Sequence, residues 1–211
     1  MLRRMARAPR IDIQGLTYHV WANAITGASL FRDRDDKDRA LAMLRDEVAI
    51  SGWTCLAYVL MSTHYHVLLR LREPTLSRGL QRMNLRYARS YNAKYSCRGH
   101  VFNGPFGAKI VEGPAEELEV ARYIALNPTR ANMCRLPEDY PWSSYGSVIG
   151  MYPKDPIVDL SAALAPVGGS RLAYRRYVEE LDPRVRRGQV RLRSRTRRAK
   201  TPKPKLVGVR P

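Results

Sequence analysis

The fold of this chain is decided by the stretch "WTCLAYVLMSTHYHVLLRLR", residues 53–72. It consists of two β-rich runs separated by a short polar pair, a pattern that predicts an antiparallel hairpin. Side chains alternate across a strand, so His64 and His66 project from one face and Tyr65 from the other. Two imidazoles on one face are the beginning of a metal site, but they also suit a strand that simply carries polar residues.

Segments on both sides of the hairpin alternate between strand and helix patterns. Leu41, Leu44 and Val48 form an apolar helical stripe that follows several Asp residues and ends near Gly52. In chain order we expect a strand over 16–25, a helix over 32–52, the hairpin, a helix over 74–95, a loop and strand over 99–112, and a helix over 113–128 that stops at Pro128. This order predicts an α+β fold, a ferredoxin-like (split βαβ) antiparallel sheet with helices packed on one face.

The C-terminal part of the chain gives weaker signals. We expect "YPWSSYGSVIG" (140–150) to be an aromatic surface segment and "RLAYRRYVEELD" (171–182) to be a short amphipathic helix. A basic tail follows. From Asp182 to Pro211 there are 12 Lys or Arg and 1 Asp, so 12 − 1 = 11 of the net 18 positive charges lie in the last 30 residues. This composition predicts a disordered tail that binds phosphate backbone.

The overall composition restricts the class of partner. A chain of 211 residues with 45% hydrophobic residues can form one folded domain with an appendage. The net charge of +18 favours a nucleic acid as partner, with an anionic membrane surface as the second choice. No apolar run approaches the roughly 20 residues of a membrane span, and we see no secretory signal or organic cofactor motif. The three cysteines are isolated and form no CxxC pair, which excludes a zinc knuckle and suggests a reducing cytoplasm. Since a nucleic acid is the favoured partner, we expect a cytoplasmic, nucleoid-associated protein.

Basic residues outside the tail are also candidates for DNA contact. The arginines of the helix over 74–95 either face solvent without a partner or form a second surface that binds the phosphates of a nucleic acid. The candidates in the folded part are Arg78, Arg82, Arg86, Arg89, Lys109 and Arg122, and those in the tail are Arg186, Arg187, Arg191, Arg193, Arg195, Arg197 and Arg198.

Tyr123 and Asn127 are the best partners for the two histidines. They are four residues apart on one predicted helix and therefore share a face. If this face crosses the histidine strand, Asn127 can give an amide oxygen to an ion held by His64 and His66, with Tyr123 one turn away. This arrangement suits transesterification of a phosphodiester by tyrosine with Mg²⁺ or Mn²⁺. On local grounds alone, Tyr123 can equally be a core residue, and Asn127 can be a helix terminator before proline.

Several segments, in order, resemble one known family. "GLTYHV", "AYVLMSTHYHVLL", "RYARSYNAKYSCRGHVF", "ARYIALNPTRANM" and "YPWSSY" are similar to segments of the REP-associated tyrosine transposases, which belong to the single-tyrosine HUH transposases of bacterial insertion sequences. The resemblance implies a protein that cleaves and rejoins single-stranded DNA near hairpins through a 5′-phosphotyrosine. By the same resemblance His64 and His66 are the HUH histidines, Tyr123 is the nucleophile, and Asn127 completes the Mg²⁺ or Mn²⁺ site.

The resemblance also suggests a division of the chain. It predicts a transposase domain over 10–148, a helical extension over 149–181 and the tail over 182–211. The sequence departs from the family at Ser62-Thr63, where Pro-Asn is usual, at Asn23-Ala24, where Arg-Gly is frequent, and at "GPFGAK" (104–109), which loses two cationic positions. These departures remove no expected ligand, but they affect the expected DNA contacts.

Three other functions agree with the same residues. The first is a non-catalytic regulator that binds hairpin DNA or RNA on the same fold. The second is a replication or conjugation nickase, against which the small size and the lack of a helicase motif count. The third is a metallohydrolase that forms no covalent adduct. The sequence leaves open whether the protein is a monomer or a homodimer.

Overall fold

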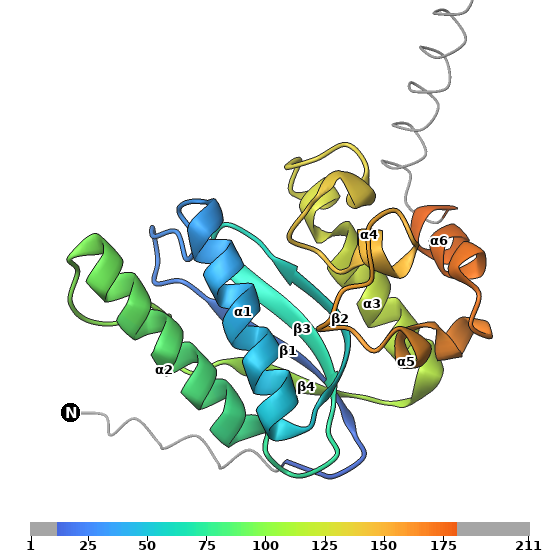
Figure 1. Ribbon diagram of the computed structural model, residues 1–211, viewed down its shortest axis with the longest axis horizontal. Coiled ribbons are helices and arrows are strands. Elements are labelled where there is room, and N and C mark those ends of the chain that lie inside the picture. The colour runs from blue at the N-terminus through green and yellow to red at the C-terminus, as the bar shows by residue number, and fades with distance from the viewer. Residues whose placement is uncertain (1–11, 181–211) are drawn as a thin grey trace, which may run out of the picture.

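A computed structural model describes residues 12–180, so the predicted tail and the seven candidate arginines named in it lie outside the described residues. Four strands form one antiparallel sheet in the order β2-β3-β1-β4 (Figure 1). The strands are β1 (Thr17–Asn23), β2 (Thr54–Leu60), β3 (His64–Arg70) and β4 (Gly107–Val111). β2 and β3 form the hairpin that the sequence predicts, and the strand order is that of a ferredoxin-like sheet. The predicted α+β class is confirmed.

Two crossover helices, α1 (Arg34–Ser51) and α2 (Leu76–Tyr95), lie across one face of the sheet (Figure 1). Asp33 caps the start of α1, because its carboxylate accepts the backbone N–H of Asp36 at 3.0 Å. Gly52 caps the end of α1 and has a φ of 63°. The positive φ explains the glycine at this position. The helix stripe predicted over 74–95 is the buried face of α2, formed by Leu76, Leu80, Met83, Tyr87 and Tyr91.

The side chain of Tyr65 belongs to the core beneath these helices. It is buried on the face of β3 opposite to the histidines, and its hydroxyl donates to Asn84 Oδ1 on α2 at 2.8 Å. The alternation predicted for His64, Tyr65 and His66 is therefore present in the strand.

α3 (Gly113–Arg130) packs on the other face of the sheet, against β2, β3 and β4. The expectation that the helices share one face is therefore wrong for α3. Buried Glu117 fixes the first half of α3, because both of its carboxylate oxygens accept from Arg70 Nη2 at 2.8 Å. α3 also continues past Pro128, since a proline in the last turn removes only one helical hydrogen bond and Pro128 is buried.

The C-terminal elements gather beside α3, on the right of Figure 1. They are the 3₁₀ turns η1 (Pro137–Asp139) and η2 (Ala165–Val167) and the helices α4 (Tyr145–Val148), α5 (Leu160–Leu164) and α6 (Arg171–Glu180). α6 confirms the helix expected over 171–182.

The segment over 140–150 is not the surface segment that we expected. Tyr140, Tyr145 and Val148 are buried. The reason is that the segment pairs with the outer edge of β2: Leu60 N–H donates to the Trp142 carbonyl at 2.9 Å, and Ser144 N–H donates to the Tyr58 carbonyl at 3.1 Å. It covers an edge strand whose backbone groups would otherwise be unpaired.

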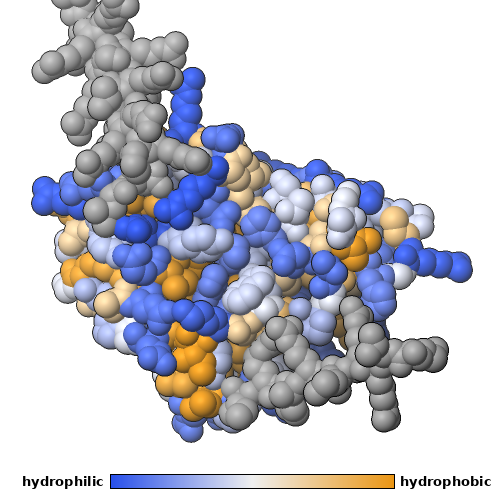
Figure 2. All heavy atoms as spheres, turned by 180° about the vertical axis from the view of Figure 1, so that it is seen from behind, coloured by the Kyte–Doolittle hydropathy of each residue, from blue (hydrophilic) through white to orange (hydrophobic). Residues whose placement is uncertain are grey.

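Figure 2 shows the molecule from behind, with hydrophobic side chains in separate patches among hydrophilic ones. Within residues 12–180, no helix is long and apolar enough to cross a membrane.

Candidate active site

The two histidines of β3 lie on the face of the sheet that α3 covers. His66 is buried, with 7% of its surface exposed, and His64 is half-buried. In the pairing of β3 with β1, His66 lies opposite Trp21 and His64 lies opposite Asn23. Their ring centroids are 5.1 Å apart.

α3 brings Tyr123 and Asn127 to these histidines. The Tyr123 ring lies edge-on to His66, with 5.3 Å between the ring centroids, and 39% of Tyr123 is exposed. The Asn127 side chain lies near enough to the His64 ring to raise its pKa. Four residues from one chain, on β3 and α3, therefore meet at one place, and Tyr123 remains open to solvent.

The surroundings keep the imidazoles neutral. Burial, with a smaller contribution from the neighbouring His19 and His64, lowers the pKa of His66 to about 3. Burial also lowers the pKa of His64, an effect that the nearby Asn127 side chain partly offsets. A neutral imidazole has one unprotonated ring nitrogen, so both rings can act as metal ligands at neutral pH. Two neutral imidazoles and a side-chain amide from neighbouring elements offer nitrogen and oxygen donors of the kind that bind divalent metal ions.

A third histidine, His19 on β1, belongs to this cluster and was not identified from the sequence. Its Nε2 lies 3.0 Å from Nδ1 of His66, and its ring lies 5.8 Å from that of Tyr123. Burial, with a smaller contribution from the charge of Lys109, lowers the pKa of His19 to about 4. The only sequence signal is its position in the alternating pattern of the first strand. That pattern does not show which residue of β3 lies beside it.

The departure at residues 104–109 has a local explanation. Gly107 pairs with Trp21 across β1 and β4, and the indole ring lies directly over it. A Cβ atom at Gly107 would be 2.2 Å from the Trp21 ring. A larger side chain at Gly107 therefore requires the Trp21 ring, which packs against His19, to move.

The arginines predicted on the helix over 74–95 fall into two groups. Arg82 pairs with the buried carboxylate of Glu47, and Arg86 pairs with Asp46 at 3.0 Å, so both tie α2 to α1. Arg78 and Arg89 are exposed and form no ion pair with any residue in the 12–180 range. All four are on a helix that covers the face opposite to His66.

Lys109 and Arg122 lie nearer to the histidines. Lys109, on β4 directly across from His19, is exposed and pairs with Glu116 at 2.7 Å. Arg122 is largely covered, because it pairs with Glu119 at 3.2 Å and packs over the ring of Tyr177 on α6. Of these two, Lys109 is the more accessible cation.

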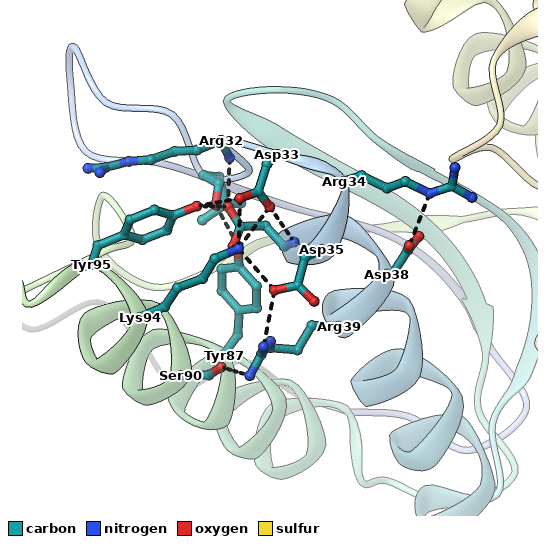
Figure 3. A network of polar contacts seen from close by, with 12 residues as sticks. Arg32, Asp33, Arg34, Asp35, Asp38, Arg39, Tyr87, Ser90, Lys94 and Tyr95 are labelled. Carbon is teal, nitrogen blue, oxygen red and sulfur yellow. Dashed lines mark hydrogen bonds and ion pairs between the residues drawn. The ribbon is translucent and has the colours of Figure 1, made fainter.

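A separate acidic cluster near the start of α1 is not a metal centre. Asp33, Asp35 and Asp36 bring carboxylate oxygens within 4.8 Å of one another. Figure 3 shows the ammonium of Lys94 among them, and it donates to the three carboxylates at 2.8, 3.0 and 2.8 Å, respectively. A protein cation thus occupies the position that a metal ion would take.

Comparison with known proteins identifies the class to which this fold and cluster belong. Residues 12–127, more than half of the chain, match the family described as "Transposase IS200 like". The protein is therefore a member of the IS200-like transposase family, as the resemblance in its sequence implied.

A solved structure supports the fold. The chain is similar to the protein in "Structure of the REP associates tyrosine transposase bound to a REP hairpin", with a TM-score of 0.59 and 16% identity. The similarity covers 72% of this chain and 90% of the other. No curated protein sequence matches the chain significantly.

Proposed function

We propose that this transposase cleaves and rejoins single-stranded DNA beside a hairpin, with Tyr123 as the nucleophile. The observation that carries the proposal is the placement of Tyr123. It is a solvent-accessible phenol on α3, its ring is 5.3 Å from that of His66, and Asn127 one turn later lies near His64. A core tyrosine would be covered instead, as Tyr65 is.

His64, His66 and Asn127 would hold the divalent ion. An ion bound there would polarise the scissile phosphate and offset its negative charge. The protein's contribution is to present two neutral ring nitrogens and one amide from rigid elements. The packing of α3 on β3 keeps these donors near one another.

In the proposed reaction, Tyr123 Oη forms a bond to phosphorus and the bond from phosphorus to the 3′ oxygen breaks. The phenol proton is balanced by the proton that the 3′ oxygen gains on leaving as a hydroxyl. The 5′ phosphate stays on Tyr123. Attack of another 3′ hydroxyl on this phosphotyrosine reverses the step, so rejoining needs no nucleotide cofactor.

Hairpin DNA is the substrate that we propose, because the solved relative is bound to a REP hairpin and this chain has a net charge of +18. Lys109 lies on the same side of the sheet as the histidines and is placed to contact phosphates near the cleavage point. Arg78 and Arg89 lie on the other side, so they would contact a more distant part of the same DNA. The tail over 182–211 would add contacts that depend on charge alone.

The experiment is a search for a covalent adduct. Purified protein is incubated with Mn²⁺ and labelled single-stranded hairpin DNA, and the products are separated in SDS. We expect an SDS-resistant adduct that Tyr123→Phe abolishes and Tyr152→Phe preserves, because Tyr152 is also exposed but lies after α4. A non-catalytic regulator or a metallohydrolase would give no adduct. An adduct that survives Tyr123→Phe would refute the proposal.

A further inference from the structure

His19 makes a contact that the proposed chemistry does not use. It lies in the middle of β1, beside β3 and on the same face as His66. Its Nε2 is 3.0 Å from Nδ1 of His66, and the two rings are stacked with centroids 5.0 Å apart. The Trp21 ring is also a neighbour of His19, with 5.3 Å between the ring centroids. The His19 ring is thus held between neighbours on its own strand and on the next.

A hydrogen bond between two ring nitrogens requires one proton on one of them. In the first arrangement Nδ1 of His66 carries the proton and donates to His19. Nε2 of His66 then keeps a free electron pair. In the second arrangement His19 donates, and the proton of a neutral His66 is on Nε2. Only the first arrangement leaves His66 with a nitrogen that can bind a metal ion.

We propose that His19 is a positioning residue that accepts the Nδ1–H of His66 and thereby directs Nε2 of His66 to the ion. This inference rests on the proposed function, because it assigns His66 as a ligand. Histidines that bind metals generally donate their other ring N–H to a nearby acceptor, which fixes both the tautomer and the ring orientation. His19 supplies such an acceptor from the adjacent strand, where the pairing of β1 with β3 fixes its distance.

The test measures Mn²⁺ affinity of the full-length protein without DNA. His19→Phe keeps an aromatic ring but removes the acceptor. We expect it to weaken Mn²⁺ binding about 10- to 100-fold, the range found for such partners. His19→Gln restores an acceptor and should recover part of this loss. The control is His100→Phe, since His100 is exposed in the loop before β4 and should have no effect.

A double variant shows whether His19 acts through His66. In a His66→Ala background, His19→Phe should cause no further loss of Mn²⁺ affinity. Wild-type affinity in His19→Phe, or an equal further loss in the His66→Ala background, would overturn the inference. If His64→Ala and His66→Ala also bind Mn²⁺ like wild type, the proposed metal site itself is wrong, which is a different failure.

A measurement on the wild-type protein tests the inference even if the His19→Phe variant does not fold. Nitrogen-15 NMR of the histidine side chains reports which nitrogen carries the proton. We expect His66 to be protonated on Nδ1 at neutral pH in the metal-free protein. Protonation of His66 on Nε2 would overturn the inference.

Discussion

At the scale of single residues, Asn127 places a side chain of the tyrosine helix beside the histidine strand. We expect Asn127→Leu to lower Mn²⁺ affinity at least about tenfold, because it removes a proposed ligand near His64. Asn127→Asp should retain binding, since a carboxylate also offers an oxygen. Isothermal titration with Mn²⁺ measures both variants, and Asn103→Leu in the exposed loop is the control. Equal affinity for Asn127→Leu and wild type would mean that Asn127 is not a ligand of the ion.

The residues of the site differ in how far the sequence could predict them. The common face of His64 and His66 follows from strand alternation, which is local. The spacing of Tyr123 and Asn127 follows from helix periodicity, which is local as well. His19 could not be predicted, because its contact with His66 depends on the register between two strands that are 47 residues apart in the chain.

At the scale of elements, Lys94 joins the end of α2 to the start of α1 by ion pairs with Asp33, Asp35 and Asp36 (Figure 3). Burial lowers the pKa of Lys94, but its hydrogen bonds to these carboxylates raise the pKa more. The hydrogen bond from Lys94 is also the main cause that lowers the pKa values of Asp33 and Asp35.

These ion pairs should make the free energy of unfolding depend on pH in the acid range. A carboxylate with a lowered pKa stabilises the fold above its unfolded pKa of about 3.9, and this contribution is lost as the pH falls through the lower folded value. We expect Lys94→Met to flatten the decrease in the urea midpoint between about pH 5 and pH 3, relative to wild type. Lys154→Met, at an exposed position, is the control. The same pH slope in Lys94→Met and wild type would contradict this account.

Element boundaries were predictable where a local signal marks them. Asp33 and Gly52 lie at the two ends of α1, and the apolar stripe of α2 has the helical period. The stop expected at Pro128 was wrong, because the buried environment of the last turn compensates for one missing hydrogen bond. The burial of residues 140–150 was missed because it depends on their pairing with β2, a partner about 80 residues earlier.

At the scale of the whole molecule, the four residues of the candidate site meet within one chain. Tyr123 lies against His66 of its own chain. We therefore expect a mixture of Tyr123→Phe and His66→Ala proteins to form no adduct with hairpin DNA, just as each variant alone forms none. A mixture of wild type and Tyr123→Phe should still form the adduct. Recovery of the adduct in the first mixture would show that tyrosine and histidines come from different chains.

The tail is expected to contribute affinity but not chemistry. Removing residues 182–211 takes away 11 net positive charges. The slope of the logarithm of DNA affinity against the logarithm of salt concentration should become shallower, by about 0.7 for each phosphate of single-stranded DNA that the tail neutralises in the full-length protein. Mn²⁺ affinity should not change. An unchanged slope would show that the tail does not bind the backbone.

The central claim is that Tyr123 becomes covalently joined to DNA. Mass spectrometry of the adduct, after digestion of the DNA and of the protein, identifies the modified residue most directly. We predict a nucleotide 5′-phosphate on the peptide that contains Tyr123. A nucleotide on a different residue, or a cleaved hairpin with no nucleotide on any peptide, would contradict the account.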